Sequence, residues 1–213
     1  QNEIGSGDAC KQCSKGTHQK LMGSSTCLDC PLGYTMNVTG SSHCNDCAKG
    51  MYANEIGSGD VCKLCEIGTY QYIKGGSTCT KCPIGYAINK TGSVECDTCK
   101  QGTFADFVGS LECKKCNVGR YSKEIGQTEK SKCLNCQFGE YSDQLGATFC
   151  KECSTHFYSD QMGSLTCKAC ESGQYSYDTP HTKCTSSACP VGTYISSTKN
   201  GKRLLAGEEE KEE

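Results

Sequence analysis

Hydrophobic residues are scattered along the chain singly or in short pairs, separated by glycine and polar residues. No window carries apolar residues at positions i, i+3 and i+4, which is the pattern of an amphipathic helix. No run approaches the roughly 20 apolar residues of a membrane span, and no charged and then hydrophobic signal segment opens the sequence. The pattern predicts very little helix, no membrane span, and short extended segments joined by turns.

Cysteine is the residue that recurs regularly. From Cys10 to Cys170 the cysteines form C-x2-C pairs, and most successive pairs begin 17 residues apart. The steps are 18 residues from Cys44 to Cys62 and 20 from Cys113 to Cys133, and the last pair is stretched to Cys184-x4-Cys189. Such self-similarity is typical of a stacked array in which each unit mainly touches its neighbours.

Glycine and aromatic residues recur in step with the cysteines. A glycine usually follows the second cysteine of a pair by three positions, and a ring such as Tyr52, Tyr70 or Phe104 follows two positions later. Another glycine usually stands four residues before the next cysteine, where Ser58 and Glu129 are exceptions. Because glycine permits tight chain reversals, each unit is predicted to be a small irregular hairpin. The rings are predicted to cover a disulfide and the next unit; the alternative is that they are exposed hairpin residues.

A longer period lies over the short one. Residues 10–61 align with residues 62–112, and the heptapeptide at 2–8 recurs unchanged at 54–60. Three units therefore make one super-repeat.

The composition excludes an ordinary globular core. Of 213 residues, 22 are cysteine and none is tryptophan, so cross-links must replace burial. The formal net charge of −2 gives no broad cationic surface, and nucleic acid and anionic membranes are not expected partners. We predict a small disulfide-rich fold: an elongated rod of about ten tandem 17-residue cystine-bridged hairpin modules, with little helix and no large hydrophobic core. The predicted divisions are a closing half-module (1–12), ten Cys-loop modules (13–184), an opening half-module (185–194) and a polar, acidic tail (195–213).

Zinc is the alternative to disulfides, because C-x2-C-x13-C-x2-C is close to the spacing of four-thiolate zinc sites. Two N-x-T triplets, at Asn37 and Asn89, occupy the same place in the super-repeat. They indicate a secretory route, in which thiols oxidise. We therefore predict disulfides, N-glycosylation at Asn37 and Asn89, and no metal or other cofactor. Lone acidic residues such as Asp60 and Glu112 are a weaker basis for calcium sites between units.

Closing each glycine-bearing loop predicts ten disulfides. The pairs are Cys13 with Cys27, Cys30 with Cys44, Cys47 with Cys62, Cys65 with Cys79, Cys82 with Cys96, Cys99 with Cys113, Cys116 with Cys133, Cys136 with Cys150, Cys153 with Cys167, and Cys170 with Cys184.

This pairing leaves Cys10 and Cys189 without partners. The residues before Cys10 match the closing half of a unit, and Cys189 to Tyr194 match the opening half. We hypothesise that Cys189 of one subunit bonds Cys10 of the next, which generates an open head-to-tail filament. The alternatives are a piece of a longer array, or cysteines that are free or capped.

No constellation of residues indicates catalysis. The four histidines fall in different units, and no phosphate loop or H-E-x-x-H motif occurs, so we do not expect an enzyme. The longest loop, which includes Ser122 to Lys132, is the one candidate site for a protein ligand.

The string Cys189-Pro-Val-Gly-Thr-Tyr194, echoed at Cys30-Pro-Leu-Gly-Tyr34, resembles the loop that opens tumour-necrosis-factor-receptor cysteine-rich domains. It is more similar to the ephrin-receptor-like cysteine-rich repeats, which run in long tandem arrays, and it has a looser similarity to ciliate cysteine-repeat surface antigens. The resemblance spans residues 1–194. In that family the cysteines flanking the loop are bonded, in agreement with the pairing above. The second, doubly bridged module of cytokine receptors is missing, so ligand capture of that kind is not expected.

Together these patterns predict an extracellular structural repeat protein, secreted or at the cell surface. It is expected to be a glycosylated rod or a head-to-tail fibre subunit whose main partner is itself. The alternative is the ectodomain stalk of a ligand-binding receptor or adhesion protein. A pull-down with the long loop deleted distinguishes the two: loss of partner binding with intact assembly would favour the receptor.

Overall fold

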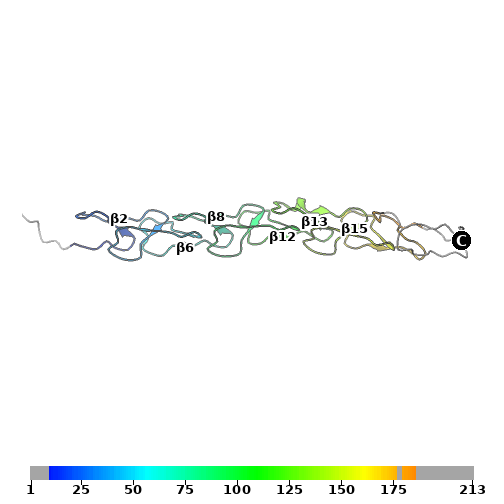
Figure 1. Ribbon diagram of the computed structural model, residues 1–213, viewed down its shortest axis with the longest axis horizontal. Helices are drawn as coiled ribbons and strands as arrows, with labels where there is room; N and C mark the ends of the chain where they lie inside the picture. The colour runs from blue at the N-terminus through cyan, green and yellow to red at the C-terminus, as the bar shows by residue number, and fades with distance from the viewer. Residues whose placement is uncertain (1–9, 177–178, 186–213) are drawn as a thin grey trace, which may run out of the picture.

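The computed structural model describes residues 10–176 and 179–185. These residues form an elongated rod, with the chain progressing from one end to the other (Figure 1). The rod is a succession of two-residue antiparallel hairpins and contains one short 3-10 helix, η1 (Lys130–Lys132), among the described residues. The prediction of a disulfide-rich repeat rod with little helix is confirmed.

Each hairpin pairs a strand that begins four residues after an opening cysteine with a strand that directly follows the closing cysteine. The pairs are β1 (Thr17–His18) with β2 (Leu28–Asp29), β3 (Tyr34–Thr35) with β4 (Asn45–Asp46), β5 (Met51–Tyr52) with β6 (Lys63–Leu64), β7 (Thr69–Tyr70) with β8 (Thr80–Lys81), β9 (Tyr86–Ala87) with β10 (Asp97–Thr98), β11 (Thr103–Phe104) with β12 (Lys114–Lys115), β13 (Arg120–Tyr121) with β14 (Leu134–Asn135), β15 (Glu140–Tyr141) with β16 (Lys151–Glu152), and β17 (Phe157–Tyr158) with β18 (Lys168–Ala169).

Ten disulfides close the hairpin loops, with the same pairs that loop closure predicts from the sequence. We number the modules by them: Cys13–Cys27 (module 1), Cys30–Cys44 (2), Cys47–Cys62 (3), Cys65–Cys79 (4), Cys82–Cys96 (5), Cys99–Cys113 (6), Cys116–Cys133 (7), Cys136–Cys150 (8), Cys153–Cys167 (9) and Cys170–Cys184 (10). Two-residue strands cannot bury a hydrophobic face, so the covalent bond must hold each hairpin closed.

A tight turn enters each hairpin, as in module 2. The N–H of Tyr34 donates to the carbonyl of Pro31 (3.1 Å), and Gly33 between them has φ 83°. A turn with positive φ at its third residue is type II, which requires glycine there. The carbonyl of Gly33 then accepts from the N–H of Cys47 (2.9 Å), so the turn also fixes the start of module 3.

Backbone hydrogen bonds join each module to the next. Between modules 2 and 3, Gly33 N–H donates to Ala53 O (2.8 Å), Met36 N–H to Ser58 O (3.1 Å) and Gly57 N–H to Cys30 O (2.8 Å). Equivalent bonds repeat along the array. Stacking of neighbours therefore satisfies backbone groups that a single hairpin would leave to water.

Modules also contact their second neighbours. The sequence predicted contacts mainly between adjacent modules, so this prediction was incomplete. A Cβ on Gly33 of module 2 would lie 2.0 Å from the carbonyl oxygen of Gly75 in module 4, and a Cβ on Gly50 would lie 2.1 Å from that of Gly92 in module 5. Such distances are far below van der Waals contact. This glycine column is therefore required for close backbone approach as well as for the turn.

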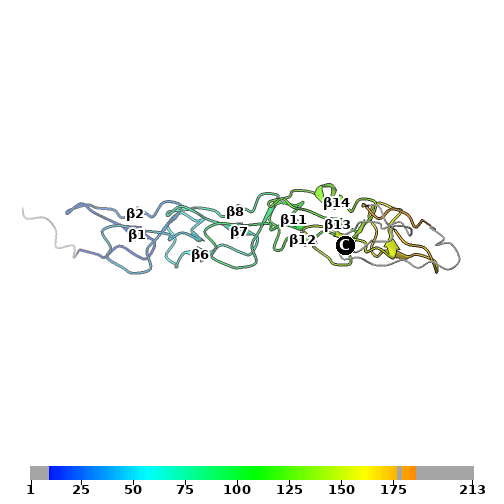
Figure 2. The ribbon, with the colours of Figure 1, turned by 45° about the vertical axis from the view of Figure 1, so that its right-hand side comes forward.

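Modules three apart lie on the same side of the rod. Strands β2, β8 and β14, from modules 1, 4 and 7, follow one edge, and β6 and β12, from modules 3 and 6, follow the opposite edge (Figures 1 and 2). One turn of the array thus takes about three modules, which accounts for the three-unit super-repeat. We call the side of modules 1, 4 and 7 face A, that of modules 2, 5 and 8 face B, and that of modules 3, 6 and 9 face C.

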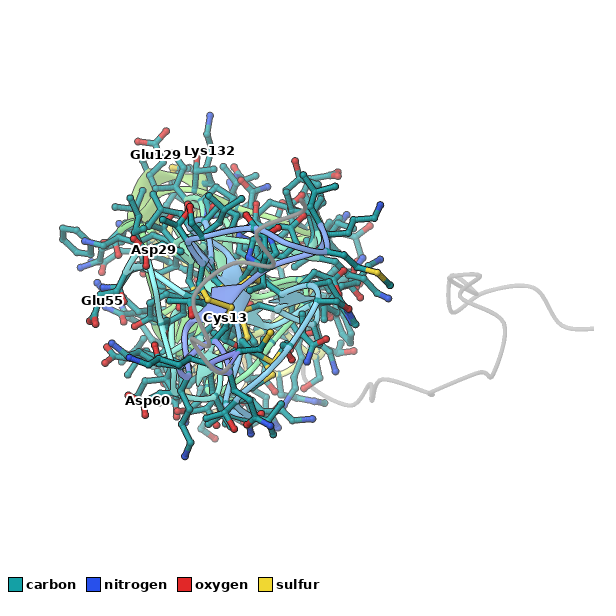
Figure 3. The ribbon with its side chains drawn as sticks, turned by 90° about the vertical axis from the view of Figure 1, so that its left-hand side faces the viewer. Cys13, Asp29, Glu55, Asp60, Glu129 and Lys132 are labelled. Carbon is teal, nitrogen blue, oxygen red and sulfur yellow. A yellow bond between two sulfur atoms is a disulfide. The ribbon has the colours of Figure 1, made fainter. Side chains whose placement is uncertain are left out.

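Sulfur takes the place of a hydrophobic core along the axis. The opening cysteines of modules 1 to 9 are at most 7% exposed, and Cys13 lies near the centre of the rod viewed end-on (Figure 3). In eight of the ten modules the residue six positions after the opening cysteine is also at most 7% exposed, and these residues form a second buried column: Met36, Ala53, Gln71, Ala105, Ser122, Ser142, Ser159 and Ser176. Because this residue bonds the modules on both sides through its backbone, its side chain is enclosed.

Two modules shift the loop glycine relative to the sequence pattern. In modules 3 and 7 the residues with positive φ are Gly57 (70°) and Gly126 (66°), not the positions of Ser58 and Glu129. The extra residues of these longer loops are therefore accommodated between the glycine and the closing cysteine.

Candidate functional site

The predicted role of the ring column is confirmed where the contact is visible. Phe104 of module 6 is 5% exposed and clusters with Cys116 and Cys133, the disulfide of module 7. Two residues that replace the ring make the same contact: His18 Nδ1 lies 3.2 Å from Cys44 Sγ, and Thr35 Oγ1 lies 3.7 Å from Cys62 Sγ. The column thus covers the disulfide of the next module, although its tyrosines within the described residues are only half-buried.

One group within the described part of the chain has metal-ligand geometry. The Nδ1 of His18 and the Sγ atoms of Cys30 and Cys44 all lie within 4.8 Å of one another. The two sulfurs are bonded to each other, and zinc is bound by thiolates rather than by disulfide sulfur. His18 and Cys44 border an open groove of about 300 Å³ with Tyr34 and His43.

The cysteines predicted to link subunits are placed differently. Cys10 is a free, exposed cysteine immediately before module 1. Cys189 lies outside the described residues, as do the half-module at 185–194, apart from Thr185, and the tail at 195–213.

Asn37 and Asn89 are both exposed. Each directly follows the residue six positions after the opening cysteine, Met36 or Ile88, and precedes the loop glycine of its module. They belong to modules 2 and 5, so both lie on face B. Both side chains are therefore accessible to solvent, in modules of the same face.

The long loop of module 7 is packed into the stack at its start and exposed at its end. Gln127 forms a β-bridge with Phe104, and the carbonyl oxygen of Gly126 would lie 2.5 Å from a Cβ on Gly85. The extra residues form η1, where Lys132 Nζ pairs with Glu129 at 3.6 Å. They project from face A (Figure 3). This candidate ligand site is therefore an exposed polar protrusion.

Ion pairs across the loops recur with one spacing. The lysine after a closing cysteine bonds the acidic residue eight positions earlier: Lys63 with Glu55 (3.2 Å), Lys114 with Asp106 (2.6 Å), Lys151 with Asp143 (2.8 Å) and Lys168 with Asp160 (2.7 Å). Three of these four ion pairs, those of Lys63, Lys114 and Lys168, lie on face C.

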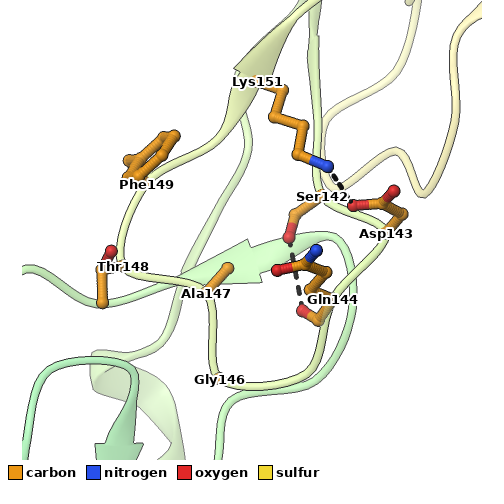
Figure 4. A pocket seen from close by; sticks show the side chains of 8 residues that line it. All are labelled: Ser142, Asp143, Gln144, Gly146, Ala147, Thr148, Phe149 and Lys151. Carbon is orange, nitrogen blue, oxygen red and sulfur yellow. Dashed lines mark hydrogen bonds and ion pairs between the residues drawn. The ribbon is translucent and has the colours of Figure 1, made fainter.

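These hydrogen bonds shift the titration of the groups involved. The bond from lysine lowers the pKa of Asp106, Asp143 and Asp160, and the same bonds raise the pKa of Lys151 and Lys168. Figure 4 shows the pair of Lys151 and Asp143 beside a shallow hollow of about 140 Å³ in module 8. Since these groups lie at the surface, where ion pairs contribute little, the pairs orient the loops rather than form a reactive centre.

Sequence reasoning missed two sets of residues, one buried and one exposed. One is the second buried column, whose signal was a run of small residues at a fixed place. The other is an apolar residue directly before the loop glycine, exposed in six modules: Met22, Ile56, Val108, Ile125, Leu145 and Met162.

None of the helices in the described ranges is long and apolar enough to be a membrane span. The extensive disulfides and the repeats point to an extracellular or cell-surface location.

A comparison with curated proteins finds no match. The family model described as tyrosine-protein kinase ephrin type A/B receptor-like matches residues 4–47, 56–93, 85–133 and 125–166. This family is defined by a receptor-like cysteine-rich repeat and is not an enzyme class. With four tandem matches over most of its length, the chain belongs to the ephrin type A/B receptor-like family.

Proposed function

We propose that the protein is an extracellular structural repeat protein. It serves as a rod that carries N-linked sugar at Asn37 and Asn89 and joins further copies head to tail into a fibre through Cys10 and Cys189. The regular succession of modules supports a structural role, because each module stacks on its neighbours through the same contacts and the array can lengthen without a change of geometry. The exposed position of both asparagines supports the attachment of sugar.

The observation that carries the head-to-tail contact is the stacking edge of module 1. The loop glycine of an inner module faces the module two places earlier: a Cβ on Gly75 would lie 3.5 Å from Tyr34 Oη, and a Cβ on Gly57 would lie 3.2 Å from Asp29 Oδ1. The equivalent Gly23 of module 1 has no described residue within 4 Å of a Cβ built on it. This edge has the shape that stacks on a preceding module, and the free Cys10 lies next to it.

In the proposed joint, residues 185–194 of one copy supply the opening half of a module and the residues up to Cys10 of the next copy supply the closing half. The two thiols lose two protons and two electrons to an oxidant of the secretory route, and a disulfide forms between Cys189 and Cys10. Such a heterologous contact does not close on itself, so it extends into a fibre.

Non-reducing electrophoresis of the secreted chain tests the joint. A ladder that collapses with reductant to the 22.9 kDa chain, plus any sugar, is expected, and the C10S variant should give no species above a dimer. A single monomer band with and without reductant would contradict the proposal. Removal of N-linked glycans should lower the mass of the wild type in two steps and that of N37Q or N89Q in one.

The second candidate is the stalk of a receptor or adhesion protein, favoured by membership of a receptor-like family. Its ligand contact would be the protruding loop of module 7. Deleting Glu129 to Ser131 shortens this loop to the common length while keeping Cys133. Loss of a captured partner with intact assembly would favour this candidate, and unchanged capture would exclude the loop as its site.

A further inference from the structure

The loop tips of the rod are apolar on faces A and C. On face C each module exposes at least two apolar side chains, Ile56 with Val61, Val108 with Leu111 and Met162 with Leu165, which are 41% to 69% exposed. Because modules 3, 6 and 9 lie on one side, these side chains form a discontinuous apolar ridge along the rod.

Face C also exposes acidic groups beside the ridge. Asp60 in module 3 and Glu112 in module 6 are exposed and have no ion-pair partner in the described ranges. They stand three modules apart. The other acidic residues of these loops, Glu55 and Asp106, are neutralised by Lys63 and Lys114. Face C therefore combines an apolar ridge with a small negative charge at a regular interval, and Figure 3 shows Asp60 projecting outward from it.

Face A has the complementary chemistry. Leu21 and Met22 of module 1 are 73% and 103% exposed, and Tyr72 and Ile73 of module 4 are 61% and 49% exposed. Lys20 and Lys74 flank these residues and are exposed, with no ion-pair partner among residues 10–176 and 179–185. They too stand three modules apart.

Face B differs from both in modules 2 and 5. There the place of the apolar tip is taken by the threonines of the two N-x-T triplets, Thr39 and Thr91, whereas module 8 of the same face exposes Leu145. Sugar on Asn37 and Asn89 would cover this side and leave faces A and C bare.

We propose that face C of one rod docks side by side on face A of a second copy of this chain. Burial of the apolar tips supplies the affinity. Asp60 and Glu112 meet Lys20 and Lys74, and both pairs form together because the acids and the lysines have the same three-module spacing. Charge pairs of this kind select the partner and its register. Face C on face C would instead place acids opposite acids.

The contact extends the proposed structural role from single fibres to bundles. It does not use the Cys10 end, so it is tested in a chain that cannot link end to end. The full chain with C10S and C189S, secreted from a eukaryotic host, is examined by sedimentation velocity over a range of concentrations. Sedimentation that increases with concentration is expected, and a chain that stays monomeric at every concentration overturns the proposal.

A sugar placed on one face identifies the contact. In module 6, D106N with V108T creates an N-x-T triplet on face C, in the same loop position as the natural triplets. In module 8, D143N with L145T creates one on face B and serves as the matched control, because each change also removes one lysine ion pair. With occupancy checked by mass, association should be lost in the first variant and retained in the second. Equal behaviour of the two variants contradicts the assignment of the face.

Charge reversal tests the pairing. K20E with K74E should weaken association roughly tenfold, which corresponds to about 1.4 kcal/mol. Adding D60K and E112K to the same chain should restore it. If the fourfold variant associates as weakly as the double variant, the salt pairs across the contact are refuted.

Discussion

The close approach of Gly33 to Gly75 gives the sharpest prediction for a single residue. Gly33 has φ 83°, and a Cβ added to it would lie 2.0 Å from the carbonyl oxygen of Gly75, two modules away. An alanine at position 33 therefore meets two obstacles, the left-handed backbone and a backbone atom that it overlaps.

The two contributions can be estimated separately. A non-glycine residue in the left-handed region costs about 1–2 kcal/mol. To relieve the overlap, module 4 must move by more than about 1 Å, since carbon atoms pack at about 3.5–4.0 Å. That movement breaks backbone hydrogen bonds such as Gly75 N–H to Cys47 O (2.8 Å), each worth about 0.5–1.5 kcal/mol net. G33A should thus destabilise the stack locally by about 3–5 kcal/mol.

Gly23 offers a matched control. It has φ 72°, but no described residue lies within 4 Å of a Cβ at this position. G23A should therefore cost only the backbone contribution of about 1–2 kcal/mol.

Native-state hydrogen exchange of the oxidised protein measures these local stabilities without assuming two-state unfolding. The amides of Ala53 and Gly75 should exchange faster in G33A by a factor of about 10² to 4 × 10³, following about 1.4 kcal/mol per tenfold change. Exchange around module 1 in G23A should rise by about tenfold. Equal effects of the two substitutions would refute the second-neighbour contact.

Two further predictions concern the loops and the ring column. The hydrogen bond from Lys168 lowers the pKa of Asp160 in the folded state. The pair therefore stabilises the loop at pH values above the ordinary pKa of 3.8, and this stabilisation is lost as pH falls through the folded-state pKa. Hydrogen exchange of module 9 should show this acid dependence and D160N should remove it; the same pH profile in D160N would count against the pair. F104A removes a buried ring, so it should destabilise module 7 by about 3 kcal/mol and speed reduction of the Cys116–Cys133 disulfide. The control F107A, at a site 65% exposed, should change stability by less than about 0.5 kcal/mol. Equal rates of reduction in the two variants would contradict the covering role.

The disulfide framework could be predicted from the sequence because the spacing of cysteine and glycine leaves one simple way to close each loop. A loop such as that from Cys30 to Cys44 contains its own turn glycines, so its pairing depends on local geometry. The same regularity identified the ring column, since Phe104 recurs at a fixed distance from a cysteine.

The contacts between second neighbours could not be predicted, because they depend on how much each module rotates relative to the last. The three-module super-repeat in the sequence reflects that rotation, but the sequence alone does not give the angle between one module and the next. The second buried column was missed for a related reason. Ser142 and Ser159 are not residues that normally form a core; they are buried because their backbone is bonded to modules on both sides.

The candidate site was predicted only in part. Asn37 and Asn89 were singled out by their triplets; the structure shows both exposed, and sugar on them stays a prediction. Their common face follows from the three-module turn. The apolar tips of faces A and C could not be predicted, because single residues such as Ile56 and Val108 are scattered in the sequence. They come to lie on one side only when successive modules rotate about the rod axis.

A peptide map of the oxidised protein, with intact mass before and after reduction, tests the central claim that disulfides hold a rod of stacked loops. The account predicts ten linked pairs within modules 1 to 10, each joining the opening and closing cysteine of one module, apart from any link between Cys10 and Cys189, and a mass gain of about two hydrogens per pair on reduction. Stoichiometric zinc with 22 titratable thiols, or links that join a cysteine of one of these ten modules to a cysteine of another, would contradict it.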